Sequence, residues 1–162
     1  YYNYEIKHSL FLISIFIKFF CFIYFMFNRK EVKNIFDETL EEFSKKHKVK
    51  CLFELMEFKD FVDLAAKSNI VKEDINSGLP ILVGALVVHS SEKDKICMSV
   101  DVLNQLSDKK DFVKALIMHE LYHILFKSKV KENNLDENLK SEKRAKKAMK
   151  REFPELSSWL MG

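Results

Sequence analysis

The 162-residue sequence has little of what flexible or cross-linked proteins need. It contains 3 glycines and 2 prolines, and so few turn-forming residues indicate a chain built mainly from helices and strands. Cys21, Cys51 and Cys97 stand far apart in no C-x-x-C pair, which argues against a disulfide framework or a thiolate metal site and fits a reducing compartment. The net charge of +3 is too small to indicate a partner, and the length suits one domain with at most a short appendage.

The one long hydrophobic run covers residues 9–27, SLFLISIFIKFFCFIYFMF, in which Lys18 is the only charge. These 19 residues are enough to cross a bilayer as a helix. Arg29, Lys30 and Lys33 follow directly, and because positive residues stay on the cytoplasmic side, a spanning helix would leave the domain of residues 28–162 in the cytoplasm. No small-residue cleavage site follows the run, so a removable signal peptide is not expected.

A second interpretation of residues 1–25 stays open. The chain begins with Tyr, its first residues are mostly Phe, Ile, Tyr, Leu, Lys and Asn, and Met26 stands just before a polar helical segment. AT-rich DNA upstream of a gene, translated by mistake, would give such a segment, which would then not belong to the native protein. Both interpretations predict a cytoplasmic domain, and only the first anchors it to a membrane. The intact mass of the native protein distinguishes them.

The remaining sequence predicts an α+β fold, with elements placed by hydrophobic periodicity. A small, mainly antiparallel sheet is expected to pack on a central hydrophobic helix, with an N-terminal backing helix and a C-terminal helix beside it. Helices are predicted at residues 31–47, 60–68, 112–126 and 135–153, and strands at 49–58, 81–89 and 96–102. The last two strands form a hairpin, Ser107 or Asp108 caps the following helix, and Pro154 stops the final one.

The central helix carries the motif His119-Glu120-Leu121-Tyr122-His123. Residues four apart share one helical face, so the two imidazoles can chelate one Zn²⁺ ion without bending the backbone. Glu120 is displaced by about 100° round the helix, where a carboxylate can act as general base towards a water molecule at the metal. The alternative is a pair of core histidines satisfied by hydrogen bonds, but buried imidazole and carboxylate groups in so apolar a helix favour the metal.

Helical phase selects the third protein ligand. The apolar residues Leu135, Leu139, Met149 and Phe153 fall within about 80° of one another at 100° per residue, and Glu142 lies in the middle of that stripe. A carboxylate in a buried face is the informative observation, so Glu142 is the predicted third ligand. Glu137 and Glu152 follow as candidates, and the other interpretation of Glu142 is an edge residue that reaches out to a lysine.

His119 to His123, followed 19 positions later by Glu142-Lys143-Arg144-Ala145, resembles the gluzincins, zinc peptidases with an H-E-x-x-H helix and a downstream E-x-x-A glutamate. The small size looks most like the minigluzincins and the ImmA/IrrE metallopeptidase group, over residues 79–153. The resemblance implies a zinc-dependent metallopeptidase that acts on peptides or unfolded proteins, with zinc on His119, His123 and Glu142. It also implies that the rim strand of the sheet pairs with extended substrate, and residues 96–102 are the expected rim.

The sequence departs from the larger gluzincins in having no room for the subdomain that supplies their oxyanion-stabilising Tyr, His or Arg. Tyr122 is expected to pack in the core, and His89 is a minor candidate for that role. Weak or latent activity is therefore expected.

A different function class is a non-catalytic or latent zinc-binding regulatory protein. The last helix is crowded with basic residues, which could contact nucleic acid, although most such runs are solvated helix faces. These residues are Lys140, Lys143, Arg144, Lys146, Lys147, Lys150 and Arg151.

Overall fold

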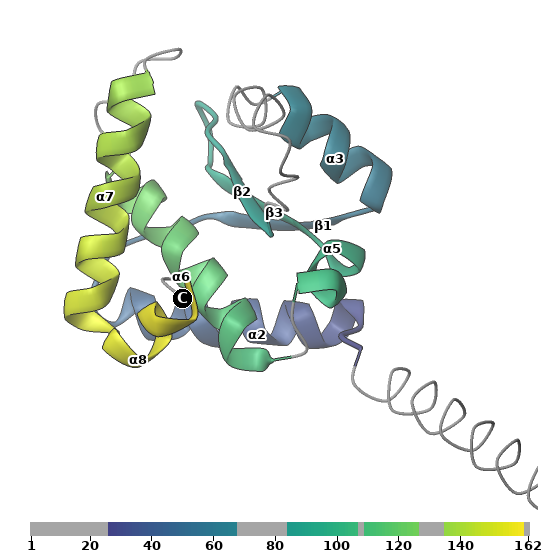
Figure 1. The fold of residues 1–162 in the computed structure, drawn as a ribbon, viewed down its shortest axis with the longest axis horizontal. Helices are drawn as coiled ribbons and strands as arrows, with labels where there is room; N and C mark the ends of the chain where they lie inside the picture. Colours follow the sequence, from purple (N-terminus) through teal and green to yellow (C-terminus); the bar gives the residue numbers. More distant parts are fainter. Residues whose placement is uncertain (1–25, 68–83, 107–108, 127–134, 161–162) are drawn as a thin grey trace, which may run out of the picture.

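The computed structural model describes residues 26–67, 84–106, 109–126 and 135–160, with the side chains of 135–139 left out. The predicted membrane segment lies almost entirely outside these residues, as do Ser107 and Asp108. None of the described helices is both long and apolar enough to cross a membrane. The helical elements are α2 (Arg29–Ser44), α3 (Phe58–Lys67), α5 (Val100–Leu106), α6 (Lys110–Phe126), α7 (Leu135–Glu152), α8 (Pro154–Ser157) and the 3-10 turn η3 (Ser158–Leu160); the strands are β1 (Leu52–Met56), β2 (Ala85–Val88) and β3 (Lys95–Ser99) (Figure 1).

The α+β class is confirmed, and the sheet corrects one part of the prediction. The strand order is β1-β3-β2. The hairpin of β2 and β3 is antiparallel as predicted, but β1 runs parallel to β3, so the sheet is mixed. The expected rim, residues 96–102, is wrong, because β3 is the central strand. Its backbone groups are already paired on both sides, and among the described strands the edges belong to β1 and β2.

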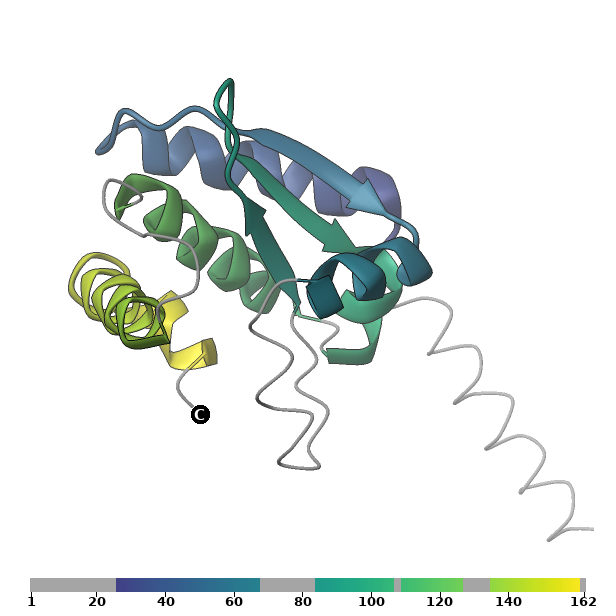
Figure 2. The ribbon, with the colours of Figure 1, turned by 90° about the horizontal axis from the view of Figure 1, so that it is seen from above.

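The central strand is buried on both faces, and its side chains alternate between two cores. Ile96 and Met98 are buried against α2 and α6, whereas Cys97 is buried with Phe61 of α3. Successive residues of a strand point to opposite faces, so each face of β3 supplies one core. The sheet therefore lies between α3 on one side and α2 with α6 on the other (Figures 1 and 2).

The predicted end of β3 is also corrected. The strand stops at Ser99 and the chain turns directly into α5, Val100–Leu106. Val102, expected to be the last strand residue, is buried in the α3-side core from this short helix instead. The alternating pattern ends in a segment that suits either element, since short apolar runs do not distinguish a strand from a helix.

The helix α6 is surrounded by other elements, which explains why nearly all its faces are apolar. It packs against α2, α7, α8, η3 and β2. Its buried residues include Val113, Ala115, Ile117, Met118 and Leu121. The helix α2 backs it and begins at Arg29, two residues before the predicted start, after a capping box in which the side chains of Asn28 and Glu31 each accept a hydrogen bond from the other's backbone N–H. This packing fixes α6, and so fixes the histidines that it carries.

Candidate metal centre

Two helices bring the three predicted metal ligands together. His119 and His123 lie one turn apart on α6, and Glu142 lies on α7, which packs against α6. On α7 the residues Ala145 and Met149 are buried. They stand three and seven positions after Glu142, on the same helical face, so the packing of that face turns Glu142 towards α6.

The polar atoms of these residues form a tight cluster. The Nε2 atoms of His119 and His123 are 3.0 Å apart. Glu142 approaches both, with Oε2 3.2 Å from Nε2 of His119 and Oε1 2.9 Å from Nε2 of His123. One ligand atom from each residue can be chosen so that all lie within 4.8 Å of one another. Two imidazole nitrogens and a carboxylate thus converge on one point between α6 and α7.

This geometry fits Zn²⁺. Tetrahedral zinc, about 2.0–2.1 Å from its nitrogen and oxygen ligands, separates neighbouring ligand atoms by roughly 3.3 Å. The two nitrogens are 3.0 Å apart, and one carboxylate oxygen lies 3.2 Å from His119 and the other 2.9 Å from His123, which is close to this value. Two histidines with one carboxylate is also a donor set typical of catalytic rather than structural zinc, because it leaves a coordination position open.

The cluster is open to solvent on one side. The side chains of His119 and His123 are 9% and 15% exposed, whereas that of Glu142 is 44% exposed. Among the described residues, the cluster is therefore exposed on the side of Glu142, while the histidines lie in the packed interior.

The electrostatics of the cluster favour an ion pair between Glu142 and the histidines. Burial opposes the charge on Glu142, but hydrogen bonds and positive charge from His119 and His123 outweigh it and hold the pKa of this carboxyl well below its usual range. Burial also opposes a proton on His123, but the hydrogen bond to Glu142 and the charges of Glu120 and Glu142 raise its pKa. The site therefore attracts positive charge, as a cation site must.

Glu120 lies in the same field without being part of the cluster. Its side chain is partly buried, and burial raises its pKa to about 7, opposed by the charges of His123 and His119 and aided by that of Glu142. A carboxylate with a pKa near neutral pH can both take up and release a proton in one cycle. Glu120 thus has the property that a general base and acid needs.

Ser141 is a site residue that the sequence analysis missed. Its hydroxyl lies 3.0 Å from Nδ1 of His123, which turns the Nε2 of that ring towards Glu142. Histidine ligands of zinc are usually oriented by such a second hydrogen bond. For His119 the matching nitrogen, Nδ1, is buried with no hydrogen-bond partner among the described residues, so the packing around its ring must hold it. The only sequence signal for Ser141 is its place directly before Glu142.

Replacing Ser141 with Ala should weaken zinc binding by roughly 10- to 100-fold, as expected for the loss of an outer-shell partner. The measurement is competition for zinc against a chromophoric chelator. Ser141→Thr, which keeps the hydroxyl, should recover most of the affinity. Equal loss in both variants would mean that the hydrogen bond to His123 does not matter.

The other candidates from the sequence lie elsewhere. Glu152 bonds to His47, with 2.9 Å between Oε2 and Nε2, and the side chain of Glu137 is outside the described residues. His89 pairs with Asp94 at 3.1 Å beside the β2–β3 turn. Tyr122 is fully buried, which agrees with its expected packing role.

The pair of His47 and Glu152 fastens the end of α7 to the end of α2. Their side chains are only 20% and 17% exposed, and the His47 ring contacts those of Phe43 and Tyr122. The pKa of the Tyr122 phenol is raised by burial and by the nearby negative charge of Glu152. The hydroxyl of Tyr122 has no hydrogen-bond partner of ordinary geometry within the described segments. This pair therefore holds α7 at the end away from Glu142.

We expect Glu152 to make folding sensitive to acid. Burial would raise its pKa, but hydrogen bonds from Arg151 and His47 lower it to about 2. A lowered folded-state pKa means that the carboxylate stabilises the fold above its ordinary pKa of about 4.5 and that this stabilisation is lost as the pH falls towards 2. Glu152→Gln should lower the free energy of unfolding by roughly 1–3 kcal/mol at pH 7 and by about half as much or less at pH 3. Urea unfolding at both pH values measures this, and an equal loss at both would contradict it.

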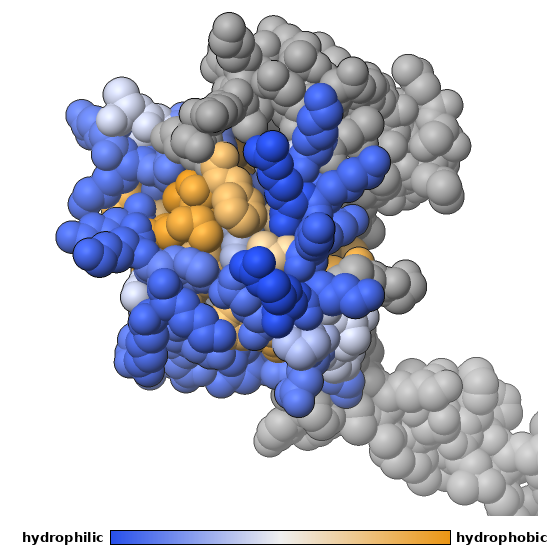
Figure 3. All heavy atoms as spheres, turned by 90° about the vertical axis from the view of Figure 1, so that its left-hand side faces the viewer, coloured by the Kyte–Doolittle hydropathy of each residue, from blue (hydrophilic) through white to orange (hydrophobic). Residues whose placement is uncertain are grey.

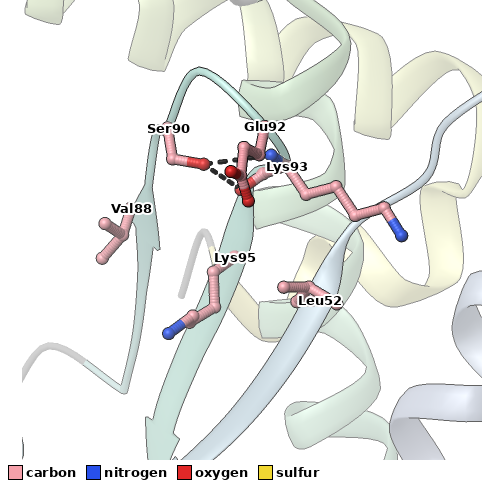
Figure 4. Close-up of a pocket in the computed structure, with 6 residues that line it drawn as sticks. All are labelled: Leu52, Val88, Ser90, Glu92, Lys93 and Lys95. Atoms are coloured by element: carbon pink, nitrogen blue, oxygen red, sulfur yellow. Dashed lines mark hydrogen bonds between the residues drawn. The ribbon is translucent and has the colours of Figure 1, made fainter.

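A shallow depression lies at the turn end of the sheet, away from these residues (Figure 4). It is lined by Leu52, Val88, Ser90, Glu92, Lys93 and Lys95. The hydroxyl of Ser90 accepts a hydrogen bond from the Lys93 N–H at 3.0 Å and donates one to its carbonyl at 2.5 Å. These bonds close the β2–β3 turn, so the depression follows from the shape of the turn.

Comparison of the chain with protein-family models, with curated proteins and with solved structures finds no match.

Proposed function

We propose that the protein is a zinc-dependent metallopeptidase. The observation that carries the proposal is the convergence of His119, His123 and Glu142 from two helices, beside a carboxylate, Glu120, whose pKa is about 7. The two imidazole nitrogens face each other 3.0 Å apart beside one carboxylate, an arrangement in which all three groups can share one cation.

Each residue then has one role. His119, His123 and Glu142 hold the ion, and Ser141 orients His123. When bound, zinc supplies Lewis acidity, which polarises a peptide carbonyl and makes water more acidic. Glu120 takes a proton from the attacking water and delivers it to the amine that leaves when the C–N bond breaks.

The edge of β2 is the best place for the main chain of a substrate. This strand is an edge of the sheet among the described elements, and it packs directly against α6. An extended peptide added to β2 would lie next to the helix that carries the motif, held by main-chain hydrogen bonds that do not depend on its sequence. This replaces the expectation that residues 96–102 bind substrate.

Metal removal tests the proposal. The full chain in a nonionic detergent should contain about one zinc ion per molecule by elemental analysis and should cleave casein or another unfolded protein. Dialysis against a chelator should abolish cleavage, and one equivalent of zinc should restore it. Absence of zinc binding would remove the site altogether. Zinc binding without cleavage would favour the alternative of a latent or regulatory zinc protein.

A further inference from the structure

The exposed face of α7 is a continuous cationic surface. Seven basic side chains between positions 140 and 151 are all exposed. At 100° per residue they fall within roughly 160° of the helix circumference, and no other residue of this stretch lies in that arc. We call this set the α7 cationic face: Lys140, Lys143, Arg144, Lys146, Lys147, Lys150 and Arg151. Figure 3 views the molecule from the side of α7 and shows mostly hydrophilic side chains there, with a smaller hydrophobic area among them.

The charge of this face is concentrated, and within the described residues little of it is paired. Its seven cations exceed the formal net charge of the whole chain, +3, so the rest of the sequence is net negative. Elsewhere several lysines pair with carboxylates of neighbouring elements or turns, as Lys95 does with Glu54, Lys110 with Glu38 and Lys114 with Glu42. Within the α7 cationic face, the described ion pairs include only that of Arg151 with Glu152.

The α7 cationic face begins next to the proposed metal centre. Lys146 stands one turn after Glu142, about 40° round the helix from it, and marks the edge of the face. Because Glu142 is on the open side of the cluster, a chain that leaves the site past Glu142 meets Lys146 first and then the rest of the face.

We propose that the α7 cationic face binds an acidic segment of the polypeptide substrate and guides the adjoining peptide bond to the metal centre. This proposal rests on the proposed function. Carboxylates spaced along an extended peptide can each approach a lysine, and such an array raises the encounter rate and gives selectivity by charge. Single-stranded nucleic acid fits less well, because the described part of this face has no aromatic side chain on which a base could stack.

Binding and cleavage of matched peptides test the proposal separately. The probes are three fluorescein-labelled peptides with one common core and a flank of four Glu, four Gln or four Lys. Anisotropy with the zinc-loaded full-length Glu120→Gln protein should show the Glu-flanked peptide binding roughly ten-fold more tightly than the Gln-flanked one in 50 mM salt, with the difference shrinking in 300 mM salt. The wild-type protein should show the same preference in kcat/KM.

Charge substitution assigns the preference to α7. The triple variant Lys143→Glu, Lys147→Glu, Lys150→Glu should lose the preference for the Glu flank and keep zinc affinity. The control triple Lys30→Glu, Lys48→Glu, Lys59→Glu removes three exposed lysines from α2, α3 and the connection between α2 and β1. This variant should keep the preference for the Glu flank. Replacing the same three α7 lysines with Gln adds no acidic residues to the helix and should remove most of the preference for the Glu flank. This neutral variant tests the proposal if the Glu triple does not fold.

Three results would overturn the proposal: equal binding of the Glu and Gln flanks, equal effects of the two triples, or displacement of the acidic peptide by a DNA oligonucleotide of the same charge at lower concentration. The last result would identify nucleic acid as the partner. If no peptide is cleaved at all, the proposed function fails, and the binding measurements still show whether the α7 cationic face selects acidic chains.

Discussion

Replacing Glu120 with Gln should reduce peptide cleavage by about 10²- to 10⁴-fold, the usual contribution of a general base, and should leave zinc affinity nearly unchanged. Glu120 is not in the cluster of His119, His123 and Glu142, so the amide removes proton transfer without removing a ligand. The measurements are kcat/KM on a fluorogenic peptide and zinc affinity by chelator competition. A loss of both together would mean that Glu120 is a ligand or a structural residue.

The same substitution should stabilise the metal-free protein at alkaline pH. Burial raises the pKa of Glu120 to about 7, above its unfolded value. Ionised Glu120 therefore lowers the free energy of unfolding. This loss is absent well below pH 4.5, grows as the pH rises towards 7 and is constant above that pH. Gln has nearly the same shape and no charge, so the variant should gain roughly 1–3 kcal/mol at pH 8 and nothing at pH 4. Glu120→Asp, a shorter carboxylate, should retain part of the activity.

The sequence predicts those parts of the candidate site that depend on spacing within a single helix. His119 and His123 share a helical face because they are four residues apart, and the hydrophobic period of the last helix predicts that Glu142 faces them. Neither argument needs the tertiary structure. The helical phase succeeded because Ala145 and Met149 are indeed buried in α7, so the predicted inward face of that helix is real where its side chains are described.

The features that the sequence did not predict depend on distant pairing. The parallel register of β1 on β3 joins Phe53 to Ile96, and nothing in either strand encodes its partner. His47 and Glu152 are 105 positions apart, and nothing in the sequence around either residue indicates the other as its partner. The wrong prediction that residues 96–102 form the rim of the sheet has the same cause. Alternating hydrophobicity in β3 indicates a strand, but it does not indicate whether one or two other strands pair with it.

Replacing Glu142 with Gln should weaken zinc binding by more than the roughly 10- to 100-fold that the loss of an outer-shell partner causes, because it removes both a ligand and the only negative charge in the cluster. The protein should stay folded, since the Glu142 side chain is 44% exposed. Chelator competition measures the affinity, and circular dichroism checks the fold. Glu155→Gln, an exposed glutamate in α8, is the matched control and should bind zinc normally.

An unchanged affinity in Glu142→Gln would direct attention to Glu137, the remaining candidate on α7, and Glu137→Gln would then be the variant that loses zinc. A loss in Glu142→Gln with none in Glu137→Gln would establish the ligand set of two histidines from one helix and one glutamate from the next. The two variants differ by five positions on one helix, about 140° of rotation, so they cannot both present a carboxylate to α6 without reorienting α7. The comparison therefore measures the rotational setting of α7 as well as the identity of the ligand.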